Sequence, residues 1–150
     1  MSGVLIKNLT RRPLHSGRRV FSAIAKSVLP DWDISLVFVS QAKARELNEK
    51  MRGKNYTPNV LSYVAGKKSA EVIICPSEAA KQAPDFRLSA SSFQLLLFIH
   101  GVLHIKGWVH GDKMDKCERN LLKRHEKAHS DGNRHRHIPS KNGRSRGALR

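Results

Sequence analysis

The segment from Ser89 to Ile105 constrains the fold most, because it is apolar over most of its length and yet carries two histidines. Ser89 or Ser91 can cap the start of a helix here, and Gly107 follows as a residue that can end one. Imidazole groups buried in such a helix need polar partners, because an unpaired polar group inside a protein is costly. The sequence therefore predicts a buried helix, late in the chain, whose histidines have a partner.

A metal ion is one such partner. His100 and His104 lie four residues apart, so a helix places both on one face, one turn apart. Gly107 can then turn the chain back so that His110 approaches from the side. Three imidazoles leave a fourth position open, which is typical of catalytic zinc rather than structural zinc. The alternative is that these histidines are ordinary core residues with hydrogen-bond partners; the spacing and the apolar surroundings favour the metal.

The chain is strongly basic, with 28 Lys and Arg against 12 Asp and Glu and a net charge of +16. Residues 129–150 contribute six basic residues and one acid, so a net charge of +11 remains on residues 1–128. A polyanion is therefore the expected partner. Nucleic acid is favoured over acidic lipid, because no amphipathic basic anchor stands out.

Composition predicts one domain over residues 1–128 and a solvated, disordered basic tail over 129–150, where apolar residues are almost missing. No apolar run is long enough to cross a bilayer, so we expect no membrane span. Cys75 and Cys117 are far apart in the sequence and form no C-x-x-C motif. We expect both to be reduced core residues of a cytoplasmic protein, or of an organellar one if the source is eukaryotic.

The first 30 residues contain no acid and several arginines, a composition that a mitochondrial transit peptide can share. We favour a strand around Val4–Ile6 and a first helix with its apolar stripe between Val20 and Val28. Ser40 can cap a further helix that Gly53 ends. The remaining patterns predict strands over 34–39, 60–64 and 71–75, and helices over 77–82 and from 112 to about 128. This order predicts an α+β domain rather than a βαβ repeat.

The spacing H-x-x-x-H-x-x-G-x-x-H is shared with metzincin peptidases, so a metallopeptidase is the first hypothesis to test. Those enzymes need a glutamate directly after the first histidine, as the base that takes a proton from water. That position is Gly101 here, so the peptidase lacks its base. A Lewis acid with an open position, in a basic protein, instead favours hydrolysis of phosphodiesters.

Residues 100–110, H-G-V-L-H-I-K-G-W-V-H, resemble H-G-x-L-H-L-x-G-Y-D-H, the signature of the YbeY family of metal-dependent endoribonucleases. Residues 47–63 contain L-N, M-R-G-K and N-V-L-S-Y in the order of the family's L-N-x-x-Y-R-G-K and [D/N]-V-L-S-F. Residues 71–75 fall on its G-D-I-x-I strand, and Met114 with Glu118 on the M-x-x-x-E of its closing helix. The resemblance extends over residues 4–126.

This resemblance implies an α+β domain with a mixed four-stranded sheet backed by helices. It also implies one zinc ion, or another divalent transition metal, on His100, His104 and His110, and single-stranded RNA as the substrate. The family's association with three-prime maturation of small-subunit ribosomal RNA and with ribosome quality control makes ribosomal RNA and the small ribosomal subunit expected partners, without DNA specificity. A ribosome-assembly or RNA-binding factor with a mainly structural metal is the alternative, and a metallopeptidase is a weaker one.

Two further residues gain a role from the resemblance. Arg52 falls on the family's functional arginine, and its guanidinium offers a planar fork for phosphate that does not lose its charge near a metal. Without the resemblance, Arg52 would be equally well explained as a solvated charge at a helix C-terminus. Ser62 matches the serine of V-L-S-F and either hydrogen-bonds the substrate or packs within the strand.

The chain departs from the family pattern at several positions. Val109 replaces the usual aspartate, so a carboxylate that could orient His110 is missing. Glu71 keeps a carboxylate that either acts on water near the metal or is a solvent charge on an edge strand. Pro58-Asn59 and Tyr63 are smaller departures.

Four more histidines follow the motif. His125 and His129 are also four residues apart, but neither a rigid third ligand nor an apolar setting accompanies them. With His135 and His137 they favour a solvated basic arm that contacts ribosomal RNA, rather than a second metal site.

Overall fold

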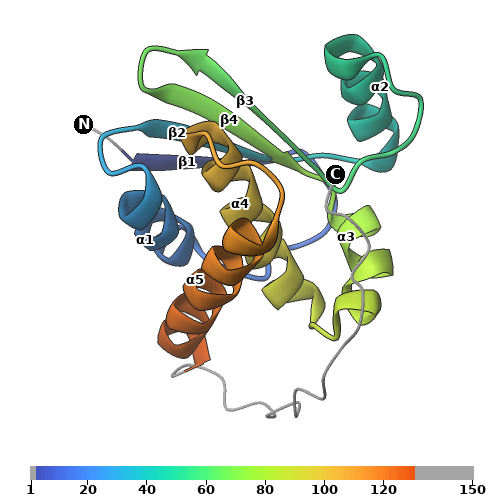
Figure 1. The fold of residues 1–150 in the computed structure, drawn as a ribbon. Helices are drawn as coiled ribbons and strands as arrows, with labels where there is room; N and C mark the ends of the chain where they lie inside the picture. The colour runs from blue at the N-terminus through green and yellow to red at the C-terminus, as the bar shows by residue number, and fades with distance from the viewer. Residues whose placement is uncertain (1–2, 131–150) are drawn as a thin grey trace.

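The computed structural model describes residues 3–130, with side chains as far as Glu126, and contains one mixed sheet (Figure 1). Its strands lie in the order β1 (Gly3–Asn8), β2 (Asp33–Phe38), β4 (Ser69–Ile74) and β3 (Val60–Gly66). β1 pairs parallel with β2, β2 pairs parallel with β4, and β3 runs antiparallel to β4. The predicted α+β fold with a mixed four-stranded sheet is confirmed.

The helices are unequally distributed around this sheet. Figure 1 shows α1 (Arg18–Val28), α4 (Ala90–Lys106) and α5 (Asp112–Ser130) on one side, with α4 between the sheet and α5. α3 (Pro76–Gln82) and a short 3-10 helix, η1 (Ala83–Phe86), lead into α4. α2 (Gln41–Arg52) stands apart from these helices and packs on the other side of the sheet. One side of the sheet therefore carries α1, α4 and α5, and the other side carries α2.

The main core forms around α4. Every residue of this helix from Phe93 to Leu103 is buried, including His100. Phe21 of α1 and Phe38 of β2 are fully buried beside it, and Phe98 contacts Phe21 edge to face at a centroid distance of 5.1 Å. The prediction of a buried helix that carries the first histidines is confirmed.

A second, smaller core holds α2 against the opposite face of the sheet. Side chains alternate along each strand, so Leu61 and Ile73 point away from α4. They pack with Val39, Ala44 and Cys75 in this smaller core. Cys75 is buried, as predicted; Cys117 is only partly buried, at the margin of the main core, and both thiols are free.

Local chemistry explains where the helices begin and end. The Ser40 hydroxyl accepts a hydrogen bond from the Lys43 N–H, and the Ser89 hydroxyl accepts one from the Ser92 N–H. Gly53 and Gly107 end α2 and α4 in the left-handed region, with φ of 65° and 111°. These four residues are the predicted caps.

Three expectations need correction. Helix α3 begins at Pro76 and not at Ser77, where the sequence pattern predicts its start, because the first helical position tolerates the missing N–H of proline. The 3-10 helix η1 was not predicted. His125 is not part of a solvated arm, because it lies on the inner side of α5 and is 7% exposed. The side chain of His129, together with His135, His137 and residues 131–150, lies outside the described residues.

Within residues 3–130, no single helix has both the length and the apolar character needed to cross a membrane; α3 with η1 and α4 meet that criterion only together, as a pair bent by 100°.

Candidate metal centre

The structure brings the three predicted histidines together. One ring nitrogen from each of His100, His104 and His110 can be chosen so that all three lie within 4.8 Å of one another. The ring centroids are 4.4 Å apart for His100 and His104, 5.1 Å for His100 and His110, and 4.5 Å for His104 and His110. The left-handed Gly107 turns the chain back after α4, which allows His110 to approach the helix. This set of side chains can hold a metal ion.

Two of the imidazoles are oriented by hydrogen bonds on their outer nitrogens. His100 Nδ1 donates to Glu118 Oε1 of α5 at 2.5 Å, and both side chains are almost fully buried. His104 Nδ1 donates to the Trp108 carbonyl at 3.0 Å. In each ring the Nε2 lone pair is then directed into the cluster, which is the arrangement that second partners of metal-bound histidines impose.

The inner nitrogens lie close together. His100 Nε2 and His104 Nε2 are 3.0 Å apart, so two lone pairs face each other unless a proton or a cation lies between them. Burial, and then the nearby His100 and His110, lower the pKa of His104 to about 4, against a smaller opposing effect of the Trp108 carbonyl. His104 is therefore neutral at physiological pH, the state in which imidazole binds a metal.

His110 has a different environment. It is exposed, and no hydrogen bond from its ring is present among the described side chains. Val109, at the position where the resembling family has aspartate, is 79% exposed and supplies no polar contact. The third imidazole is thus the least constrained of the three.

The cluster opens into a cavity of about 540 Å³. Arg52, at the C-terminal end of α2, lines this cavity together with the three imidazoles. Ser62 lines it from β3, which is an edge strand of the sheet. Arg52 and Ser62, the residues for which the sequence suggests substrate binding, therefore share one cavity with the three imidazoles. The other lining residues are Met51, Val60, Leu61 and Tyr63.

Arg52 is held by its own helix and the loop that follows. Its Nη1 donates to the Tyr56 hydroxyl at 3.0 Å and to Asn48 Oδ1 at 3.5 Å. Asn48 is fully buried, and its Nδ2 donates to the Tyr56 carbonyl at 2.9 Å, which ties the loop to α2. Because a guanidinium has five N–H donors, these contacts leave donors for an anion in the cavity.

Gly101 lies where α4 packs closely against the sheet. A Cβ at this position would lie 3.1 Å from Val72 Cγ1 and 3.5 Å from Ser62 Cβ. The side of α4 that carries position 101 therefore packs on β3 and β4. The residue that excluded a peptidase base in the sequence is a packing glycine in the structure.

The expectations for Glu71 were wrong. β4 lies between β2 and β3, so it is not an edge strand, and Glu71 is partly buried. Val72 points toward α4, so its neighbour Glu71 points to the opposite face and does not line the cavity. There it lies opposite Tyr63 in the β3–β4 pair, and burial, followed by the nearby Glu71 carboxylate, raises the pKa of Tyr63.

The sequence analysis missed the roles of Glu118, Asn48 and Tyr56. For Glu118 the sequence offers only a match to a family motif, with no function attached. A signal was available, because Met114, Glu118 and Leu121 lie at helical spacing on one buried stripe, and a buried carboxylate requires a polar partner. For Asn48 and Tyr56 no comparable signal exists, since their contacts depend on the path of the loop between α2 and β3.

Comparison with known proteins agrees with this geometry. Residues 10–131 match the family model described as Endoribonuclease YbeY. Curated relatives of that name from Xanthomonas campestris and Stenotrophomonas maltophilia are each 31% identical to this chain, over 71% of it and 76% of their own length. The solution structure of TM1509 from Thermotoga maritima shares the fold with a TM-score of 0.63 at 19% identity, over 93% of this chain and 99% of that protein.

Proposed function

We propose a reaction from one premise: this chain belongs to the endoribonuclease YbeY family, which consists of hydrolytic, metal-dependent nucleases. The proposed reaction is zinc-dependent cleavage of single-stranded RNA. The observation that carries it is that Arg52 and the three-imidazole cluster line the same cavity. A fixed cation beside a metal site is suited to a phosphodiester, because both bind phosphate oxygens.

The ligand set favours zinc. Three neutral imidazoles are typical ligands of catalytic zinc, and two nitrogens on a tetrahedral zinc lie about 3.3 Å apart. The 3.0 Å between His100 Nε2 and His104 Nε2 is close to that separation. When bound, zinc supplies a Lewis acid that polarises phosphate and acidifies water. His100, His104 and His110 would hold it, and Glu118 would fix the orientation of His100 through Nδ1.

The side chains around the cluster have separate roles in the proposal. Arg52 binds a non-bridging phosphate oxygen through the N–H groups that Tyr56 and Asn48 leave free, and it stabilises the negative charge that grows during cleavage. Ser62 donates a hydrogen bond to the sugar or phosphate of the bound strand. Edge strand β3 forms the wall along which the RNA lies.

We further propose that the substrate is the three-prime region of small-subunit ribosomal RNA, during maturation and quality control of that subunit. Family membership and the net charge of +16 support this assignment. The charge favours a large polyanion over a short oligonucleotide.

The test is a cleavage assay with zinc-loaded, full-length protein on single-stranded RNA. Wild type should cut internally, and His104→Ala should neither cut nor bind zinc. Arg52→Ala should keep its zinc but cut more slowly, on the order of 10²-fold, as found when one donor to a developing anion is removed. Arg45→Ala is the matched control, because Arg45 lies on the same helix with its side chain 56% exposed and outside the cavity.

Two results would contradict the proposal: wild type that leaves RNA intact, or Arg52→Ala that cuts as fast as Arg45→Ala. RNA binding without cleavage would favour the alternative, an assembly factor in which the metal is structural.

A further inference from the structure

The exposed surface of α1 and of the described part of α5 carries several cations. Arg18, Arg19 and Lys26 project from α1, and Arg119, Lys123 and Arg124 from the later part of α5. None of these six forms a salt bridge with a described side chain. We call them the α1–α5 cation face. Acids on α5 are mostly at its beginning, where Asp112 and Asp115 accompany Lys113 and Lys116, while Glu126 near its end is partly buried.

Helix α2 shows that this is not a general property of the protein's basic residues. Lys43 and Lys50 pair with Glu46 at 3.6 Å and 2.9 Å, and Arg45 pairs with Glu49 at 3.9 Å. These three cations of α2 are therefore compensated along their own helix. Those of the α1–α5 cation face produce an uncompensated positive potential.

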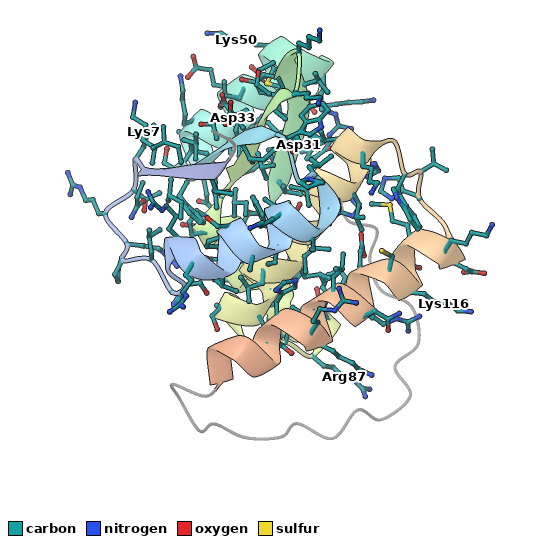
Figure 2. All side chains as sticks on the ribbon, turned by 90° about the vertical axis from the view of Figure 1, so that its left-hand side faces the viewer. Lys7, Asp31, Asp33, Lys50, Arg87 and Lys116 are labelled. Carbon is teal, nitrogen blue, oxygen red and sulfur yellow. The ribbon has the colours of Figure 1, made fainter. Side chains whose placement is uncertain are left out.

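The two helices form one continuous surface. They pack against each other and cross the face that Figure 2 turns toward the viewer, where Lys116 projects from α5. They run in opposite directions in this view, so the beginning of α1 lies on the same side as the end of α5. Phe21 and Ile24 of α1 and Leu121 and Leu122 of α5 are buried, which leaves the cations on the outside.

This surface is separate from the metal cavity. The cavity is lined by residues of α2, β3 and α4 and by His110, and by no described residue of α1 or α5. α5 begins close to His110 and leads away from it: from Asp112 to Lys123 a helix rises about 16 Å. A single RNA molecule can therefore contact both sites at different points.

The chemistry of the surface selects the partner. Exposed residues of α1 and of the described part of α5 are charged, polar or alanine, and the aromatic Phe21 and His125 are buried. Binding of single strands usually adds aromatic side chains on which the bases stack, and an amphipathic helix that binds a membrane presents an exposed apolar face. A surface of charges alone can bind phosphates whose bases are already paired, because double-stranded RNA is recognised largely through its shape and backbone.

We propose that the α1–α5 cation face docks the phosphate backbone of a double-stranded RNA segment, while the strand to be cut enters the metal cavity. The docking surface rests on the proposed function only in taking RNA as the partner. It implies that the preferred substrate is single-stranded RNA next to a folded stem.

The experiment compares two triple variants of the full-length protein. Arg119→Gln/Lys123→Gln/Arg124→Gln removes three charges from the α1–α5 cation face, and Lys43→Gln/Arg45→Gln/Lys50→Gln removes three from α2. Both are titrated with a blunt RNA stem at several KCl concentrations, and thermal melting verifies that each is folded. Loss of three phosphate contacts should make the slope of log affinity against log salt less steep by about 2 to 3 for the α5 variant. The α2 variant should retain the wild-type slope, since its cations are paired and distant charges are screened beyond about 10 Å.

An equal decrease of the salt slope in both variants would mean that RNA is attracted to the net charge of the protein as a whole, and it would overturn the docking surface. A wild-type slope in the α5 variant would overturn it as well. Binding to phosphatidylserine vesicles that depends on the same residues, without binding to the stem, would also overturn it. Cleavage of a short single-stranded RNA should be the same in the α5 variant and wild type. If neither cleaves it while stem binding differs as expected, the proposed reaction fails and the docking surface stands.

Discussion

The two helices that supply the cavity, α4 and α2, are embedded in the protein to very different degrees. α4 is buried from Phe93 to Leu103 and carries His100 and His104 as part of the main core. α2 buries only Ala44 and Asn48, and its ion pairs lie on its exposed surface. The metal ligands are thus fixed by core packing, whereas Arg52 depends on a small core and on a few hydrogen bonds.

This difference teaches how the two halves of the site should respond to mutation. Exposed ion pairs contribute roughly 0–1 kcal/mol each, so those of α2 fix its position only weakly. Asn48, which binds Arg52 and the Tyr56 carbonyl, is the firmest link between α2 and the loop that follows. Changes around α4 should therefore alter metal affinity, and changes around α2 should alter RNA cleavage without altering the metal.

The largest effect is expected from removal of a metal ligand. His104→Ala should lower zinc affinity by more than about 100-fold, the upper end of losses seen for residues that only support a ligand. The fold should survive, because His104 is only partly buried and the core around Phe98 and Leu103 is unchanged. Competition with a chromophoric chelator measures the affinity, and circular dichroism measures the fold. Arg52→Ala should match wild type in zinc affinity and in its circular dichroism spectrum. Equal zinc affinities of wild type and His104→Ala would exclude His104 as a metal ligand.

A smaller loss should follow from Glu118→Gln. The amide keeps the shape of the buried carboxylate but removes the charge that faces His100 Nδ1 across 2.5 Å. Zinc affinity should fall about 10- to 100-fold, the usual cost of removing such a partner. Glu126→Gln on the same helix is the control, because Glu126 is partly exposed and makes no contact with the cluster. Equal affinities of the two variants would show that Glu118 does not tune the metal site.

On the α2 side, Tyr56→Phe should slow RNA cleavage modestly. The variant loses the hydroxyl that accepts from Arg52 Nη1 at 3.0 Å, and one hydrogen bond is worth about 1 kcal/mol, or about 5-fold in kcat/KM. Zinc affinity should not change. Tyr56→Phe should have no further effect when Arg52 is already alanine, which a double-mutant cycle measures. If the two effects add instead, Tyr56 acts on the substrate and not through Arg52.

The difference between α4 and the rest of the site also appears in what can be predicted from the sequence. Ser89, Gly107 and the four-residue spacing of two histidines are local signals, and they predicted α4, its ends and its ligands. Helical spacing also indicates which residues are buried, but not which helix they face. Glu118 was therefore matched to a motif without its partner His100.

Long-range order accounts for the error at Glu71, but not for the one at His125. Glu71 was expected on an edge strand or near the metal, but the position of β4 between β2 and β3 follows from the fold, not from the local pattern. The histidine pair at 125 and 129 was interpreted without the buried stripe of α5, on which Met114, Leu121 and Leu122 already lay at helical spacing. The same helical spacing places His125 four residues after Leu121, on the buried side of α5.

The smallest predicted effect is the dependence of stability on pH in the metal-free protein. It has two sources, His104 in the metal cluster and His125, which is buried in α5. Burial, with a smaller effect of Arg124, lowers the pKa of His125, and burial with the neighbouring imidazoles lowers that of His104 to about 4. Both start from 6.5 in the unfolded chain, so below that pH the unfolded state binds more protons. The stability that these neutral imidazoles provide is complete above pH 6.5 and is lost as the pH falls from 6.5 through the pKa values of the folded protein.

Thermal melting between pH 7 and pH 4 should show a falling Tm, with a shallower fall in His125→Gln because glutamine does not titrate. Zinc should reduce the part of the fall in Tm that comes from His104 and leave the part that comes from His125, since protons compete with the metal only in the cluster. An equal effect of zinc on both parts would mean that His125 is coupled to the metal site through α5.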